Sequence, residues 1–86
     1  MITKAVVEER LRALLAPVFL KVVDNSGGCG AAFHAYIVSQ QFSGKRLLER
    51  HRLVNGAIAE EMPHIHAFTM QCLTPDEWEA KDRPES

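Results

Sequence analysis

The chain has 86 residues, of which 47% are hydrophobic and 24% are charged, and its formal net charge is -1 at pH 7. This length allows one small domain with a modest core. The balance of apolar and charged residues excludes an intrinsically disordered chain. A protein that binds nucleic acid mainly through phosphates is usually clearly basic, so the charge disfavours that class.

The two cysteines, Cys29 and Cys72, cannot form the disulfide framework of a small secreted domain. The amino-terminal segment carries charges where a signal peptide needs an apolar run, and it is not the acid-poor, arginine-rich stretch of a transit peptide. Every apolar stretch is far shorter than the roughly 20 residues that cross a membrane. We therefore expect a cytoplasmic protein, with the nucleus as an alternative, and no membrane partner.

In the first half of the chain, the pattern predicts a helix and a hairpin. The helix covers residues 3–16, where apolar side chains recur at helical spacing until Pro17. Two β-rich runs, 18–23 and 32–40, are predicted as strands. The glycine-rich stretch 24–30 between them is the strongest loop signal in the chain, so we expect a hairpin with a long tip.

After a turn near residues 42–45, the sequence becomes helical again. Leu47 and Leu48 indicate a short helix, and an apolar stripe from Val54 to Met62 indicates a second one. A break near residues 49–52 is compatible with this pattern but is not required by it. Pro63 ends this region, and residues 64–71 are predicted as the third strand.

The last helix has a clear start. Thr74 is suited to cap it, Pro75 suits its first position, and Glu77 completes a capping box, while Trp78 is the expected anchor to the core. The predicted order is α-β-β-α-α-β-α, an α+β fold with a three-stranded sheet and helices on one face. We expect one domain over residues 1–80 and a polar tail over 81–86.

Cys29 lies in a Ser-Gly-Gly-Cys-Gly loop and is the first candidate for chemistry. Glycines let the backbone approach a bound group closely, and an exposed thiolate is a soft metal ligand. The alternative is an incidental surface thiol. Cys72 is interpreted as a small buried hydrophobic residue.

His64 and His66 form the second candidate site. On a strand, residues two apart point to the same face, so both imidazoles could converge on a metal. The plainer alternative, which the pattern by itself favours, is a pair of surface histidines after a proline.

Ligand number limits what these residues can bind. A structural zinc site and a [2Fe-2S] cluster each take four ligands. Cys29 with His66 supplies two, and His64 would make three. If they bind metal, the protein offers a partial site, and a partner or a small thiol must complete it.

The basic segment at residues 44–52 is the third candidate site. In a helix-turn-helix setting, Arg50, Arg52 and Asn55 could contact phosphates or base edges, with Lys45 and Arg46 adding charge. We prefer a solvated helix face, because nearby glutamates weaken the positive patch. The patch would equally suit an acidic protein partner.

Motifs typical of enzymes are missing. The sequence has no glycine-rich phosphate loop between a strand and a helix and no recognisable nucleophile motif. We therefore expect a protein that is not an enzyme, and a thiol-reactive enzyme using Cys29 is the weakest hypothesis.

Taken together, the motifs resemble the BolA family. The resemblance extends from the first helix to Trp78, and the Ser-Gly-Gly-Cys-Gly loop is most similar to that of the cytosolic eukaryotic BolA-like type. The motifs that carry it are Phe42-x-Gly44-Lys45-x-Leu47-Leu48-x-Arg50-His51-Arg52-Leu53-Val54-Asn55, Glu60-Glu61-Met62-Pro63-His64-Ile65-His66-Ala67-Phe68 and Leu73-Thr74-Pro75-x-x-Trp78.

The resemblance implies a fold related to the second class of KH domain and a partnership with monothiol glutaredoxins. In such complexes a [2Fe-2S] cluster is bridged, with two ligands from the glutaredoxin cysteine and glutathione and two from the BolA-like protein. By the family pattern these two are Cys29 and His66. His64 lies outside the pattern and is left as a neighbour of the site or a surface residue.

The resemblance also implies an alternative, transcriptional regulation through DNA contact. RNA-binding KH domains use a G-x-x-G loop between two helices. The corresponding turn near residues 49–52 has no glycine, and Gly27-Gly28-Cys29-Gly30 lies in the hairpin loop instead. We therefore disfavour RNA binding, and our leading hypothesis is an iron–sulfur adaptor that assembles, transfers or senses the cluster.

Overall fold

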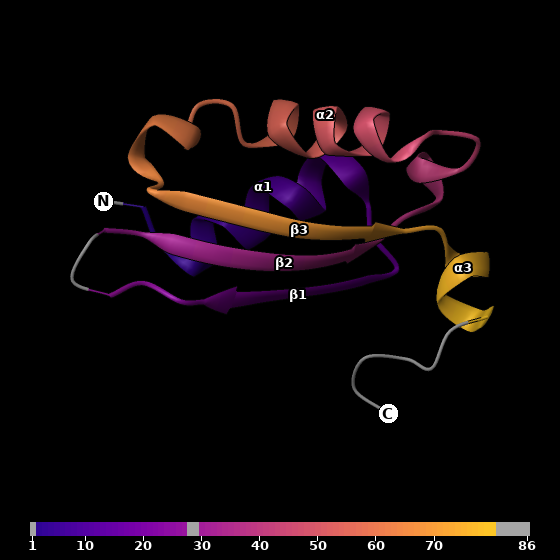
Figure 1. Ribbon diagram of the computed structural model, residues 1–86, viewed down its shortest axis with the longest axis horizontal. Coiled ribbons are helices and arrows are strands. Elements are labelled where there is room, and N and C mark those ends of the chain that lie inside the picture. Colours follow the sequence, from indigo (N-terminus) through magenta and orange to yellow (C-terminus); the bar gives the residue numbers. More distant parts are fainter. Residues whose placement is uncertain (1, 28–29, 81–86) are drawn as a thin grey trace.

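A computed structural model describes residues 2–27 and 30–80, so Cys29 and the predicted tail at 81–86 lie outside the described residues. The described residues form three strands, three α-helices and two short 3₁₀-helices (Figure 1). In chain order the elements are α1 (Lys4–Leu15), β1 (Phe19–Asp24), β2 (Ala32–Val38), η1 (Gln40–Phe42), α2 (Leu47–Ala57), η2 (Met62–His64), β3 (Ala67–Leu73) and α3 (Pro75–Ala80).

The sheet has the order β1-β2-β3, with β2 in the middle. β1 and β2 pair antiparallel as the predicted hairpin, whereas β2 and β3 pair parallel. A parallel pair needs a crossover connection, and the segment that contains α2 provides it. The register places Val22 opposite Ala35, and Ala35 opposite Met70.

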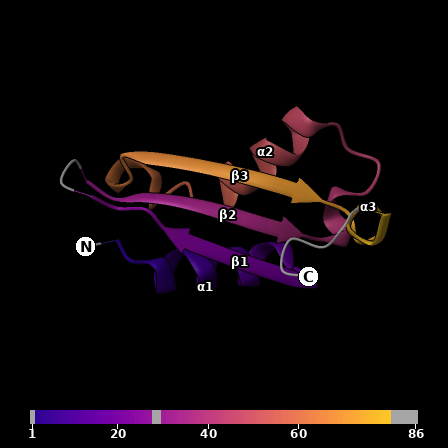
Figure 2. The same ribbon diagram turned by 60° about the horizontal axis from the view of Figure 1, so that its bottom comes forward.

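Two helices, α1 and α2, cover one face of this sheet, as Figures 1 and 2 both show. α1 packs against β1 and α2, and α2 packs against β3. The core forms where the apolar stripes of these helices meet the inward side chains of the strands, and its buried members are Val7, Leu11, Leu15, Val22, Phe33, Ala35, Ile37, Phe42, Val54, Ala57, Ile58 and Cys72. The predicted α+β class with a three-stranded sheet is confirmed.

The first helix matches its prediction closely. The Thr3 side chain caps it by accepting a hydrogen bond from the N–H of Val6, at 3.4 Å. It ends at Leu15, and Ala16 takes a left-handed conformation with φ 44° before Pro17.

The predicted pair of helices between β2 and β3 is wrong. The structure has one helix, α2, that continues through residues 49–52. Glu49 supports its first turn, because its Oε1 accepts a hydrogen bond from the N–H of Arg46 at 2.9 Å. Residues 49–52 include no glycine or proline, so nothing there interrupts the helical ladder.

The third strand begins later than predicted. Pro63 lies inside η2, where the N–H of His64 donates to the carbonyl of Glu61 at 2.9 Å and that of Ile65 to the carbonyl of Met62 at 3.0 Å. Extended pairing starts only at Ala67. His64 and His66 therefore do not share a strand face.

The capping box of α3 is confirmed. The N–H of Glu77 donates to Oγ1 of Thr74 at 3.1 Å, and the N–H of Thr74 donates to Oε1 of Glu77 at 3.0 Å. Trp78 stacks on Phe19 of β1, with ring centroids 5.0 Å apart, rather than entering the main core cluster. α3 thus lies at the end of the sheet (Figure 1).

Candidate functional site

The loop between β1 and β2 is anchored on both sides of Gly28 and Cys29. At its base, the N–H of Asn25 donates to the carbonyl of Ala32 at 2.8 Å, and the N–H of Ala32 donates to Oγ of Ser26 at 2.9 Å. Gly27 and Gly30 then form an isolated antiparallel bridge. Gly27 and Gly30 therefore lie opposite each other, close to the ends of β1 and β2.

Gly30 lies directly against His66. A Cβ added at Gly30 would stand 3.2 Å from Cβ of His66, and Gly30 has a φ of +119°, which side chains rarely adopt. The N–H of His66 also donates to the carbonyl of Ala31 at 2.7 Å. His66 itself is exposed. The fold thus brings His66 to the residue that follows Cys29, although they are far apart in sequence.

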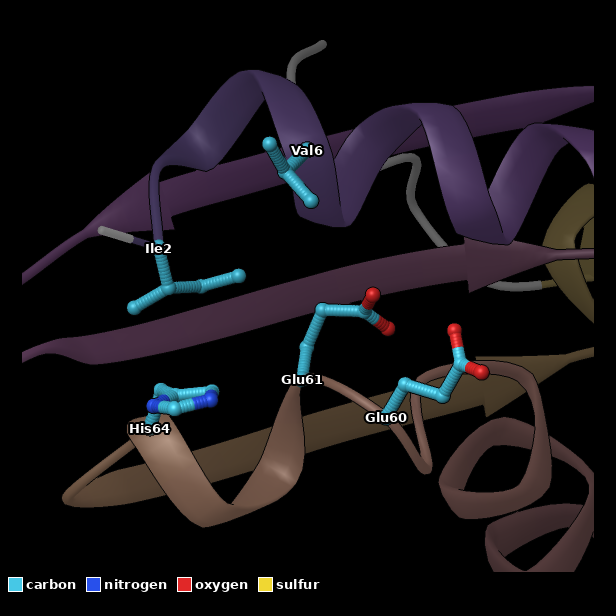
Figure 3. A pocket seen from close by; sticks show the side chains of 5 residues that line it. All are labelled: Ile2, Val6, Glu60, Glu61 and His64. Atoms are coloured by element: carbon cyan, nitrogen blue, oxygen red, sulfur yellow. The ribbon is translucent and has the colours of Figure 1, made fainter.

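His64 belongs to a different surface. It lines a pocket of about 280 Å³ between the start of α1 and η2, together with Ile2, Val6, Glu60 and Glu61 (Figure 3). None of these neighbours comes from the β1–β2 loop.

Sequence analysis missed the ion pairs beside this pocket. Arg10 of α1 donates from Nε to Oε2 of Glu61 at 3.1 Å and contacts Oε1 of Glu60 at 3.3 Å. Glu61 is 8% exposed. The sequence shows Glu60 and Glu61 as adjacent acidic residues, but it does not show that Arg10, about 50 residues earlier, will pair with them.

Metal-ligating side chains are sparse in the described part of the chain. Within residues 2–27 and 30–80, no three His, Cys, Asp or Glu side chains are grouped so that they could hold a metal ion. Cys72 is buried, and burial raises the pKa of its thiol to about 11. That thiol stays protonated near neutral pH and is a poor ligand, as expected for a small core residue.

The basic residues at 45–52 and Asn55 have different environments in the fold. Lys45, Arg46, Arg52 and Asn55 are exposed, but Arg50 is not available for phosphate. Its Nη1 and Nη2 donate to the two carboxylate oxygens of Glu77 at 2.6 and 3.1 Å. Nε donates to the carbonyl of Lys45 at 2.9 Å, and Nη1 donates to that of Cys72 at 3.2 Å.

Arg50 is therefore a structural residue that joins α2 to the end of β3 and to α3. Its side chain is 11% exposed. The hydrogen bonds to Glu77 raise the pKa of Arg50 above its ordinary value. The helix-turn-helix alternative assumed a free Arg50 at a break between two helices, whereas α2 is one helix here and the Arg50 guanidinium is bound by Glu77.

Comparisons with known proteins agree with this arrangement. The family model for "BolA-like protein" matches residues 11–77. The chain belongs to the BolA-like protein family. The Arabidopsis thaliana relative Protein BOLA2 is 53% identical over 79 residues, which cover 91% of this chain and 85% of the relative.

Other BolA-like proteins extend the comparison. The crystal structure of a Bol-like protein from Babesia bovis is 76% identical and superimposes with a TM-score of 0.94, covering 96% of both chains. A relative from Escherichia coli, named DNA-binding transcriptional regulator BolA, is 41% identical over 80 residues, covering 85% of this chain and 76% of the relative. Among the described residues, no helix is long and apolar enough to cross a membrane.

Proposed function

We propose that this BolA-like protein is an iron–sulfur adaptor of the cytoplasm. It supplies Cys29 and His66 to a [2Fe-2S] cluster whose other ligands come from a monothiol glutaredoxin and glutathione, and it serves cluster assembly, transfer or iron sensing. Its role is ligation and not catalysis.

The observation that carries this proposal is the contact between Gly30 and His66. The two residues are brought together by the start of β3 and the loop that precedes β2, and the residue before Gly30 is Cys29. A thiolate and an imidazole from these two segments form a donor set that suits iron.

Ligand number supports the need for a partner. A [2Fe-2S] cluster takes four protein or thiol ligands, and two donors from this chain leave two positions open. One histidine in place of a thiolate also makes the cluster less negative, which raises its reduction potential. Such a cluster is better suited to delivery or sensing than to permanent storage.

Mixing the purified protein with a cluster-loaded monothiol glutaredoxin and glutathione tests the proposal. We expect a heterocomplex in size-exclusion chromatography and a visible absorption and circular dichroism spectrum that differs from that of the glutaredoxin alone. His66→Ala should change this spectrum more than the matched variant His64→Ala. Unchanged spectra without a complex would refute the adaptor role, and equal effects of the two variants would refute the ligand assignment.

A second candidate function, DNA binding, is favoured by the name of the Escherichia coli relative. In this chain the contacts would come from Lys45, Arg46, Arg52 and Asn55, since Arg50 is bound to Glu77. Phosphate contacts weaken steeply as salt rises. Absence of binding to duplex DNA at low salt would exclude this function.

A further inference from the structure

The outer surface of α2 and the last turn of α1 form a groove that the cluster site does not use. We define the α1–α2 groove by six residues: Leu14, Gln41, Lys45, Arg52, Leu53 and Gly56. It consists of two hollows of about 320 Å³ each, and both are lined by Arg52 and Leu53, so they are neighbours along α2.

Apolar side chains are exposed in and beside this groove. Leu14, which lines the groove, is 53% exposed. Leu48, which lies one helical turn before Arg52, is 61% exposed. Burying such leucines against a partner is favourable because it removes apolar surface from water. Exposed apolar patches with polar rims commonly mark interaction sites.

Two cations, Lys45 and Arg52, and one carboxylate, Glu49, line the groove, and Arg46 follows Lys45 in the sequence. Lys45, Arg46 and Arg52 form no ion pair among the described residues, whose salt bridges involve only Arg10 and Arg50 as cations. The carboxylate nearby, Glu49, accepts a hydrogen bond from the N–H of Arg46. Because the whole chain has a net charge of -1, this face differs in sign from the average surface.

Gly56 leaves the backbone of α2 bare inside the groove. It lies within a helix, where glycine is less favourable than alanine, and a Cβ added there would meet nothing within 4 Å. The missing side chain deepens the hollow and allows another backbone to approach closely.

From these features, we propose that the α1–α2 groove docks an acidic amphipathic helix of a partner protein. Leucines of that helix would lie over Leu14, Leu53 and Gly56, and its carboxylates would pair with Lys45 and Arg52. This helix-in-groove mode combines apolar anchors with complementary charge.

A nucleic acid fits the same face less well. Phosphates gain nothing from the exposed leucines, Glu49 contributes a carboxylate to one hollow, and Arg50 is held by Glu77. The groove also begins where β3 ends, because Arg50 of α2 reaches the carbonyl of Cys72. His66 precedes the other end of β3, so both surfaces could be occupied at once.

A peptide titration of the isotope-labelled protein, followed by NMR, tests this proposal without any glutaredoxin. The probe is a synthetic helical peptide with leucines along one face and glutamates beside them, and its control has lysine in place of every glutamate. We expect saturable shifts of the amides of Leu14, Arg52 and Gly56, unchanged amides around His66, and affinity for the control peptide lower by about tenfold or more.

Two matched pairs of variants locate the site. Arg52→Glu should weaken peptide binding about tenfold. Lys21→Glu, at an exposed position of β1 outside the groove, should leave peptide binding unchanged. Gly56→Phe should block the groove, whereas Gly56→Ala should keep it open, and open space around this position lets both variants fold.

Three results would overturn the proposal. The first is no saturable binding of the acidic peptide, and the second is binding of the lysine control with equal affinity. The third is duplex DNA that shifts the same amides at lower concentration than the peptide does, which would assign the face to nucleic acid.

Discussion

Gly30 is the residue at which the β1–β2 loop meets the proposed site. Its φ is +119°, and a Cβ added there would stand only 3.2 Å from Cβ of His66, which leaves little room for a side chain. Gly27 has neither constraint, since a Cβ there meets nothing within 4 Å. Substituting each of these two glycines in turn therefore separates the effect of the backbone geometry at Gly30 from the effect of losing a loop glycine.

Gly30→Ala should therefore destabilise the protein by about 1–2 kcal/mol, because alanine is strained at positive φ. The variant should also alter the spectrum of the shared cluster by displacing His66. Urea unfolding and visible circular dichroism measure the two effects, with Gly27→Ala as the control. Equal behaviour of the two variants would contradict the close contact between Gly30 and His66.

Cys72 shows how burial changes the acidity of a thiol. Because burial raises the pKa of Cys72 from 9.0 to about 11, the folded state keeps the proton that an unfolded chain would release. The free energy of unfolding is therefore independent of this thiol below pH 9, and it falls as pH rises from 9 toward 11 because only the unfolded chain releases the proton.

In the variant Cys29→Ser, which leaves Cys72 as the single thiol of the chain, we expect very slow labelling by a disulfide reagent at neutral pH and fast labelling after unfolding in urea. The rate of thiol release measures this directly. Rapid labelling of the native variant would show that Cys72 is accessible and would weaken the case for Cys29 as the reactive donor.

At the scale of elements, Glu77 connects three segments. Its backbone and carboxylate form the cap of α3 with Thr74, and its two oxygens accept hydrogen bonds from Arg50 of α2, beside the end of β3. One side chain thus fixes a short helix and the start of the crossover helix together.

Glu77→Ala should reduce the free energy of unfolding by about 2 kcal/mol, since it removes the cap and leaves the largely buried guanidinium of Arg50 without its carboxylate. Glu77→Gln should lose less, because an amide still completes a capping box. Denaturant unfolding compares both with Asp76→Asn on the exposed side of α3. A loss no larger than that of the control would show that the ion pair contributes nothing.

Local signals explain which elements are predictable. The periodic leucines of α1, the hairpin with its glycine-rich loop and the Thr74–Glu77 box are specified by neighbouring residues, and the structure has all three. The pattern leaves open whether the helix breaks at residues 49–52, because periodicity is ambiguous in a basic run, and in the structure the helix continues. The late start of β3 depends on the 3₁₀ turn around Pro63, which competes with the β-rich pattern that follows.

For the candidate site, the sequence predicts which residues take part but not how they are arranged in space. The pairing of Arg50 with Glu77 and the contact of Gly30 with His66 join segments more than 20 residues apart, so spacing alone does not show them. The resemblance to the BolA family points to Cys29 and His66, and the fold explains why the segments that carry them adjoin.

At the scale of the whole molecule, the two ends of the sheet carry different surfaces. The β1–β2 loop and His66 lie where β3 begins, and the α1–α2 groove starts where β3 ends. Figure 1 shows the start of β3 at one end of the sheet and the start of α2 at the other. This division suits the proposed adaptor role, in which one surface would hold the shared cluster while another would stay open to a recipient or regulator.

In the proposed adaptor, an imidazole of this chain ligates a cluster shared with the glutaredoxin. Pulsed electron paramagnetic resonance of the reduced complex, in which only this protein carries isotope-labelled histidine, detects such a ligand. We predict a nitrogen coupling from the labelled histidine that persists in His64→Ala and disappears in His66→Ala. A reduced cluster without that coupling, or a coupling that His64→Ala removes, would contradict the account.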